Sequence, residues 1–150
     1  GVNVMITHCN TLSPDEIAGL YRSGATWVEA FIDQPAFIQH ADVVVSHAGL
    51  NTVLETVAAA RPLLMVPMAF DQPAIAARIV HHGLGRRVSR YAASATMARQ
   101  IGALLDDEGA HARLQAASRA LAACGGAARG AEIVEQALTT GRPVLRAADS

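Results

Sequence analysis

Residues 41–55 read ADVVVSHAGLNTVLE, and this stretch decides the fold. It opens with a run of three valines, passes through a short corner at residues 46–49, and continues with apolar residues at helical spacing. The pattern predicts a buried β-strand, a sharp turn and an α-helix. Because open α/β sheets bind ligands at the carboxyl ends of their parallel strands, this corner is a candidate ligand site.

The corner and the helix after it carry four polar side chains, His47, Asn51, Thr52 and Glu55. A helix start offers unpaired N–H groups and a positive dipole end, so it suits a phosphate group, to which His47 can also donate. Glu55 lies one turn after Asn51 on the same face, where a carboxylate can accept the hydroxyls of a ribose. The alternative is structural. Thr52 and Glu55 have the spacing of a capping box, and His47 can bond to nearby backbone. Spacing alone favours this capping role over nucleotide binding, and the two roles can coexist.

Polar side chains also follow two other predicted strands. Asp71 and Gln72 come after the apolar strand at residues 63–66, and Gln34 follows the strand at residues 25–31. An adjacent carboxylate and amide suit the hydroxyls of a sugar. Taken alone, Asp71 before a proline is better explained as a helix cap, and Gln34 as a loop residue. Taken together, three strand ends present polar groups on the side of the sheet where ligands bind.

Composition argues against several classes of protein. With 150 residues the chain fits one domain, and its net charge of −1 gives no sign of binding to nucleic acid or to an anionic membrane surface. No apolar run approaches the roughly 20 residues of a membrane span. Cys9 and Cys124 lack metal-ligand spacing, so we expect no metal site and a reduced, cytoplasmic setting. The other histidines also lack acidic or cysteine partners at metal-ligand spacing; they are His8, His40, His81, His82 and His111.

Strand and helix patterns alternate over the first 90 residues or so. Strands are predicted at residues 2–7, 25–31, 41–46, 63–66 and 87–88. Helices are predicted at residues 14–24 with Ser13 as cap, 34–40, 50–60, 73–82, 94–105 with Ser94 as cap, 111–123 and 127–140. This order predicts an α/β fold, a Rossmann-like parallel sheet with flanking helices, followed by carboxyl-terminal helices. No internal boundary is visible, so residues 1–140 are predicted to form one partial domain and residues 141–150 a flexible tail.

Two motifs in order resemble a known family. They are SHAGLNTxxE at residues 46–55 and PxxxDQP at residues 67–73, and the likeness covers residues 31–138. The chain resembles the nucleotide-sugar-dependent glycosyltransferases of the two-domain GT-B fold, in the family that includes plant and bacterial UDP-glycosyltransferases. Within that family it is similar to the bacterial carotenoid glucosyltransferases, through residues 50–55, 69–73 and 83–87.

The resemblance implies a role for each candidate residue. It identifies the chain as the carboxyl-terminal, donor-binding half of an enzyme that moves a hexosyl group, expected to be glucose, from a UDP-sugar to a hydroxyl of a lipophilic acceptor such as a carotenoid. UDP-glucose is then a co-substrate, and neither a cofactor nor a metal ion is expected. The diphosphate would be bound by Ser46, His47, Gly49, Asn51 and Thr52, the ribose by Glu55, the donor sugar by Asp71 and Gln72, and the uracil by Phe31 and Gln34.

The chain departs from the family pattern at three positions. Phe31 stands where the family has a tryptophan that packs on the uracil. Ala48 replaces the usual Gly or Cys and is expected to crowd the phosphate loop slightly. Arg61 replaces a Gly that often precedes Pro62, which changes how the helix ends.

Two parts of such an enzyme have no counterpart in this sequence. The family's catalytic base is a histidine of the amino-terminal, acceptor-binding domain, and no residue here matches it, so no catalytic residue is assigned. The first strand and helix of the donor-binding domain also have no match; that strand would lie between the strands that begin near Val2 and Val43. The gap leaves unpaired backbone, so we expect the chain to need its acceptor domain or a partner chain, to self-associate, or to re-pair its strands. The isolated chain is predicted not to transfer sugar.

Other interpretations remain open. The chain can be a separate UDP-sugar-binding subunit that needs a partner to supply the acceptor site. It can be another member of the fold, such as a transferase that uses UDP-N-acetylglucosamine or a nucleotide-sugar epimerase. It can also be a structural α/β domain in which the polar groups only cap helices. For the full-length enzyme we expect a cytoplasmic location, with peripheral contact to the inner face of the membrane left open.

Overall fold

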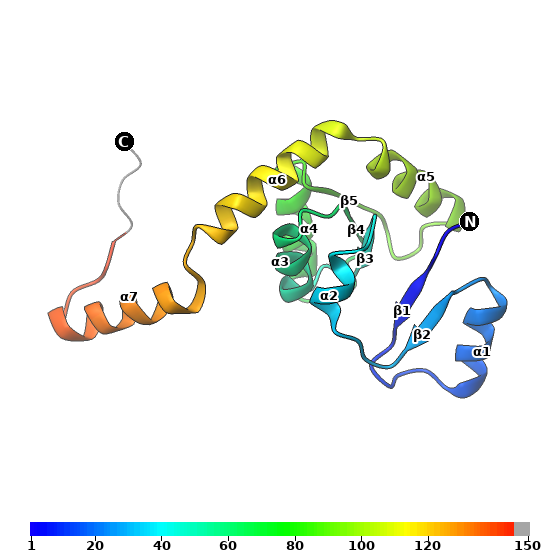
Figure 1. The fold of residues 1–150 in the computed structure, drawn as a ribbon, viewed down its shortest axis with the longest axis horizontal. Coiled ribbons are helices and arrows are strands. Elements are labelled where there is room, and N and C mark those ends of the chain that lie inside the picture. The colour runs from blue at the N-terminus through cyan, green and yellow to red at the C-terminus, as the bar shows by residue number, and fades with distance from the viewer. Residues whose placement is uncertain (146–150) are drawn as a thin grey trace. The chain divides into compact units, whose positions relative to one another are not determined.

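The protein forms two compact units in its computed structural model, which describes residues 1–145 (Figure 1). The first unit comprises residues 1–42, and the second begins at Val43. The end of the predicted tail, residues 146–150, lies outside the described part of the chain. None of the described helices combines the length and the apolar content that crossing a membrane requires.

The first unit alternates strand and helix. Its elements are β1 (Met5–Thr7), α1 (Pro14–Arg22), β2 (Trp27–Glu29) and α2 (Gln34–Ile38). The two strands pair in parallel, with Met5 opposite Trp27. The pairing continues past both strands, because the N–H group of Cys9 donates to the carbonyl of Ala30 at 2.9 Å. The loops that follow β1 and β2 therefore leave the sheet side by side.

Helix α1 begins with a capping box, at the serine that the sequence indicates. The Glu16 carboxylate accepts hydrogen bonds from the backbone N–H and from the hydroxyl of Ser13, both at 2.8 Å. In return the Ser13 hydroxyl accepts from the N–H of Glu16 at 3.4 Å. Both bonds favour the ionised carboxylate, the bond from the backbone more than the bond from the hydroxyl. The pKa of Glu16 is therefore lowered from its ordinary value. Local side-chain chemistry thus sets the start of this helix.

The second unit is built on a sheet of three parallel strands. Its elements are β3 (Val44–Ser46), α3 (Leu50–Ala58), β4 (Leu63–Met65), α4 (Gln72–His81), β5 (Gly85–Arg87), α5 (Ser94–Leu105), α6 (Glu108–Ala122) and α7 (Gly126–Thr140). The strand order is β3-β4-β5, and Leu63 lies opposite both Val44 and Gly85. Helix α4 packs on β5, α5 contacts β4 and β5, and α3 packs against α6. Figure 1 shows α3 and α4 along the same side of this sheet.

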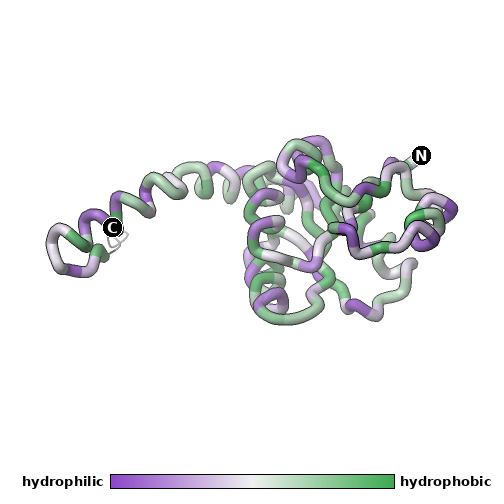
Figure 2. The backbone as a smooth tube through the Cα atoms, turned by 90° about the horizontal axis from the view of Figure 1, so that it is seen from below, coloured by the Kyte–Doolittle hydropathy of each residue, from purple (hydrophilic) through white to green (hydrophobic). Residues whose placement is uncertain are grey.

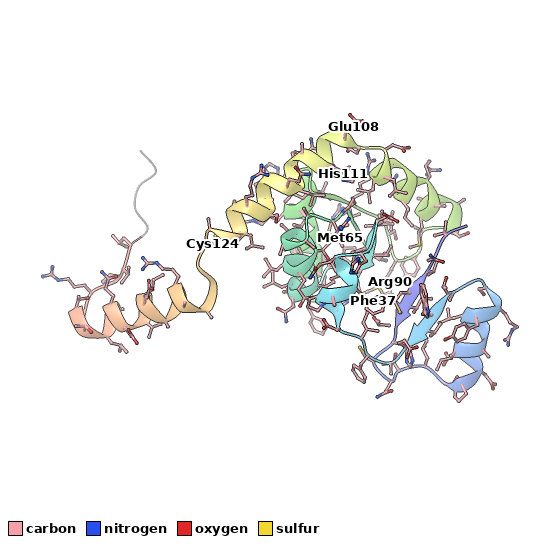
Figure 3. The ribbon with its side chains drawn as sticks, viewed as in Figure 1. Phe37, Met65, Arg90, Glu108, His111 and Cys124 are labelled. Carbon is pink, nitrogen blue, oxygen red and sulfur yellow. The ribbon has the colours of Figure 1, made fainter. Side chains whose placement is uncertain are left out.

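The middle strand of this sheet, β4, is buried along its whole length. Leu63, Leu64 and Met65 have no exposed surface, which explains why the sequence is an uninterrupted apolar run and not an alternating one. Met65, labelled within the sheet in Figure 3, belongs to a core cluster with Val53 and Val57 of α3. Burial of one such side chain stabilises the fold by about 1.5–3 kcal/mol, so β4 anchors the second unit.

The last two helices differ in how they pack. Leu114 of α6 is fully buried, and the Ser118 hydroxyl donates to the carbonyl of Ala58, at the end of α3, at 2.6 Å. Helix α7 buries no residue, although apolar and polar residues alternate along it, as the green and purple bands near the end marked C in Figure 2 show. Helix α6 therefore belongs to the core of the second unit, whereas α7 contributes no buried side chain.

Some boundaries differ from the predicted ones. The first four strands are shorter than predicted, because the parallel pairing covers three residues. The fifth, β5, begins two residues earlier than predicted and ends at Arg87. Helix α6 begins at Glu108 and not at His111, because the Asp107 side chain caps it by accepting from the N–H of Ala110 at 2.8 Å. Ser94 is not a cap; it is the first residue of α5, and no side-chain hydrogen bond caps that helix.

The described strands form two sheets instead of one. Strands β1 and β3 do not pair with each other, so each has one edge without a partner among residues 1–145. This agrees with the gap expected between these two strands. Within residues 1–145, no re-pairing joins β1 to β3.

We expect Ser13→Ala to lower the free energy of unfolding by about 1 kcal/mol, measured by urea denaturation at neutral pH, because the α1 capping box is lost. Ser94→Ala is the matched control and should change it by less than about 0.5 kcal/mol, since that hydroxyl caps nothing. The ionised Glu16 contributes above its ordinary pKa, and its contribution disappears as the pH falls through the lowered folded-state pKa. The effect of Ser13→Ala should therefore shrink in acid. Equal losses for the two variants would contradict this account.

Candidate functional site

The turn between β3 and α3 is tight and uses an uncommon backbone conformation. Ala48 has φ 69°, in the left-handed region, which costs a residue with a side chain about 1–3 kcal/mol. The Ser46 hydroxyl holds the turn by accepting a hydrogen bond from the N–H of Ala48 at 3.1 Å. The Ala48 side chain is fully buried in the core cluster. Its methyl group is therefore not on the solvent side of the turn, and the crowding expected there does not arise.

The His47 imidazole lies against Gly49, the residue that precedes α3. A β-carbon on Gly49 would be 2.6 Å from Nε2 of His47, which is too close for two such atoms. Gly49 has an ordinary φ of −62°, so a larger residue here would meet the His47 ring and would not strain the backbone. Because His47 is exposed, its imidazole both covers the start of the helix and faces solvent.

No side chain caps the start of α3. Gly49 occupies the cap position, and no side-chain cap hydrogen bond is made there. The capping box predicted for Thr52 and Glu55 does not form, because Thr52 is already inside the helix. The positive end of the helix dipole therefore faces the corner, with Asn51 exposed beside it and Glu55 half-buried one turn later.

The loop after β4 ends at Asp71, which occupies the cap position of α4. The predicted position is confirmed, but the Asp71 side chain makes no cap hydrogen bond to α4 and is exposed. Gln72 holds the loop instead, because its Oε1 accepts from the N–H groups of Met68 at 2.8 Å and Ala69 at 3.0 Å. The side-chain NH2 group is then the part of Gln72 that can donate to a ligand.

The corner and the β4 loop lie at one edge of the same sheet. Ser46 and Met65 are paired at the ends of β3 and β4, and the N–H of Val66 donates to the carbonyl of Ser46 at 2.8 Å. The two polypeptide segments therefore leave the sheet next to each other. The candidates at this edge are Ser46, His47, Gly49, Asn51, Thr52, Glu55, Asp71 and Gln72.

The two remaining candidates border a hollow in the first unit. Phe31 and Gln34 line it, and Phe31 is 67% exposed, so a face of its ring is open for stacking. The hollow lies past the carboxyl ends of β1 and β2, the side of a parallel sheet at which ligands bind. Its other lining residues are Thr7, Cys9, Ala30 and Ile32.

Two of these lining residues were missed by sequence reasoning. Thr7 and Cys9 come from the end of β1 and the loop after it, and the signal that could have identified them was their place at the carboxyl end of the first predicted strand. Cys9 and Cys124 are both exposed free thiols. Within residues 1–145, no three His, Cys, Asp or Glu side chains are grouped so that they could hold a metal ion.

Gly49→Ala is expected to displace the His47 imidazole while α3 stays folded, because alanine tolerates the φ of Gly49. The change should appear as shifted imidazole resonances of His47 in a two-dimensional NMR spectrum, with the free energy of unfolding altered by less than about 1 kcal/mol. Gly102→Ala is the control, because a β-carbon there meets nothing within 4 Å. Unmoved His47 resonances in Gly49→Ala would show that the contact is not tight.

Comparison with known proteins places the chain in one family. Residues 6–136 match the Glycosyltransferase family 28 C-terminal domain. The chain is 51% identical over 138 residues to a zeaxanthin glucosyltransferase of Pseudescherichia vulneris, and the match covers 92% of this chain and 33% of that protein. It is 41% identical over 142 residues to a zeaxanthin glucosyltransferase of Pantoea ananas, covering 95% of this chain and 33% of the relative.

The fold is similar to that of solved glycosyltransferases. CalG4, the calicheamicin glycosyltransferase, superimposes with a TM-score of 0.74 at 22% identity, covering 95% of this chain and 45% of that one. This likeness confirms the predicted Rossmann-like α/β fold of the GT-B enzymes. The chain spans about a third of the length of the curated relatives it matches. From the match over residues 6–136, we conclude that the chain belongs to the glycosyltransferase family 28 C-terminal domains.

Proposed function

We propose that this chain is the donor-binding part of a glycosyltransferase that transfers glucose from UDP-glucose to a hydroxyl group of a lipophilic acceptor such as a carotenoid. The observation that carries the proposal is the start of α3, an uncapped helix end with the His47 imidazole lying against Gly49. Such a helix end binds phosphate groups well. The relatives named zeaxanthin glucosyltransferase support the choice of sugar and acceptor class.

The proposal gives each candidate residue one part of the donor. The corner residues surround the diphosphate, Glu55 accepts the ribose hydroxyls, and Asp71 with Gln72 binds the hydroxyls of the glucose. In the first unit, the Phe31 ring stacks on the uracil and Gln34 bonds to its edge, which suits the hollow that both residues line. The diphosphate ligands are Ser46, His47, Gly49, Asn51 and Thr52.

The contribution of this chain to the reaction is to stabilise the leaving group. As the acceptor oxygen bonds to the anomeric carbon of glucose, the bond from that carbon to UDP breaks and negative charge builds up on the diphosphate. The α3 dipole and a hydrogen bond donated by His47 stabilise that charge, so the proposal requires no metal ion. The acceptor hydroxyl gives its proton to a base outside this chain, in an amino-terminal acceptor domain or a partner chain, and the isolated chain is inactive.

UDP should protect Cys9 from a thiol reagent, because the uracil occupies the hollow that Cys9 lines. With UDP at ten times its dissociation constant, the modification rate of Cys9 in the full-length enzyme should fall roughly tenfold. Cys124, just after α6 in Figure 3, is the internal control and should react at an unchanged rate. Mass spectrometry of the two peptides measures both rates. If calorimetry shows UDP binding while Cys9 stays reactive, the uracil lies elsewhere.

Asp71→Ala should raise the KM for UDP-glucose by roughly 10–100-fold, the loss expected for a hydrogen bond to a charged group. Its affinity for UDP should be unchanged, because UDP carries no sugar for Asp71 to bind. Its stability should also be unchanged, since the Asp71 side chain caps no helix. Asp107→Ala is the stability control and should lose about 1 kcal/mol, because that carboxylate caps α6. An equal loss of UDP and UDP-glucose affinity in Asp71→Ala would contradict a role in sugar binding.

A further inference from the structure

The loop between β4 and α4 carries the most exposed large apolar side chain that the structure describes. Phe70 is 93% exposed, and Met68 in the same loop is 52% exposed. Phe70 also has φ 56°, in the left-handed region that bulky side chains rarely adopt. Backbone strain of this kind gathers at functional sites, where the surrounding structure maintains it. An exposed, strained aromatic residue therefore indicates a role beyond folding.

Hydrogen bonds on both sides of Phe70 fix its position. Before it, the N–H groups of Met68 and Ala69 donate to the side chain of Gln72, and the N–H of Gln72 donates to the carbonyl of Ala69 at 3.3 Å. After it, the carbonyl of Asp71 accepts from the first turn of α4, from the N–H of Ile75 at 3.1 Å. The ring is thus presented to solvent by a loop that is held in place.

We propose that Phe70, together with Met68 of the same loop, binds the apolar part of the acceptor next to the hydroxyl that receives the sugar. The inference rests on the proposed function, in which Asp71 holds the donor glucose. Phe70 directly precedes Asp71, and the acceptor oxygen must reach the anomeric carbon of that glucose. Part of the acceptor therefore lies within reach of the Phe70 ring.

The chemistry of the Phe70 side chain indicates the class of acceptor. A phenylalanine ring offers a large, flat apolar surface and no hydrogen-bonding group, and Met68 adds a flexible apolar side chain. Such a surface gains free energy by covering a hydrocarbon chain and gains little from a polar acceptor. Phe70 is thus a specificity-determining residue for an acceptor with an extended apolar body beside its hydroxyl group.

The test compares Phe70→Ala with the wild type in the full-length enzyme, with zeaxanthin in detergent micelles as the acceptor. Alanine keeps a β-carbon at the left-handed position but removes the ring. The KM for zeaxanthin should rise roughly tenfold, whereas the KM for UDP-glucose and the slow hydrolysis of UDP-glucose by water should stay within about twofold. Phe70→Tyr retains the ring and should keep the wild-type KM for zeaxanthin.

Phe37→Ala is the matched control, because it truncates a phenylalanine of α2 that is 44% exposed and is not among the candidate site residues. It should leave the KM for zeaxanthin unchanged. An unchanged zeaxanthin KM in Phe70→Ala would overturn the inference, as would an equal loss in hydrolysis by water. A lowered melting temperature with an unchanged KM would also overturn it, because the ring would then pack against another part of the protein. A wild-type enzyme that binds no UDP-glucose would overturn the proposed function, and the inference with it.

Discussion

The parallel pairing of β3 with β4 determines where the rest of the second unit lies. Because Ser46 is paired with Met65, the two strands end at the same level and the loops after them leave the sheet together. The complete burial of β4 holds this pairing in place. A slip of one residue would move the corner by about 3.3 Å relative to the loop that carries Asp71, enough to break any arrangement of groups around a ligand.

At the ends of these two strands, neither the start of α3 nor the start of α4 receives a side-chain cap hydrogen bond. The start of α3 is capped by a residue without a side chain, and the Asp71 carboxylate caps nothing. The loops themselves are held by other groups, namely the hydroxyl of Ser46 and the side-chain oxygen of Gln72. In the proposed site, the groups that fix the loops are thus different from the Asp71 carboxylate and the helix start that would bind the donor, as a preorganised site requires.

The order of elements and the position of the corner could be predicted from the sequence, because apolar runs and turn residues are local signals. The caps could not. A Thr-x-x-Glu spacing fits a capping box, but α3 begins at Leu50, two residues before Thr52, because the chain turns left-handed at Ala48 and Gly49 takes the cap position. Of the residues that line the hollow, Phe31 and Gln34 were predicted as site residues, but Thr7 and Cys9 were not. These two line it because β1 pairs with β2, and no local sequence pattern reveals that pairing.

The end of α3 shows the same limit. The predicted helix reached Ala60, but it ends at Ala58, because Ala60 turns left-handed with φ 53° and the N–H of Arg61 donates to the carbonyl of Thr56 at 3.0 Å. This bond closes the helix in the manner of a glycine-terminated one, although neither residue is glycine. Alanine is uncommon in this conformation, so the sequence did not indicate a helix end at Ala58.

The left-handed conformation of Ala48 has a consequence for how this turn can evolve. Its buried methyl group gains about 0.8 kcal/mol, which is similar to the lower end of the conformational cost that alanine carries there. Glycine would lose both terms at once. Alanine and glycine codons differ by a single nucleotide. At the lower end of that conformational cost, a mutation can therefore exchange the two residues with little change in the free energy of unfolding.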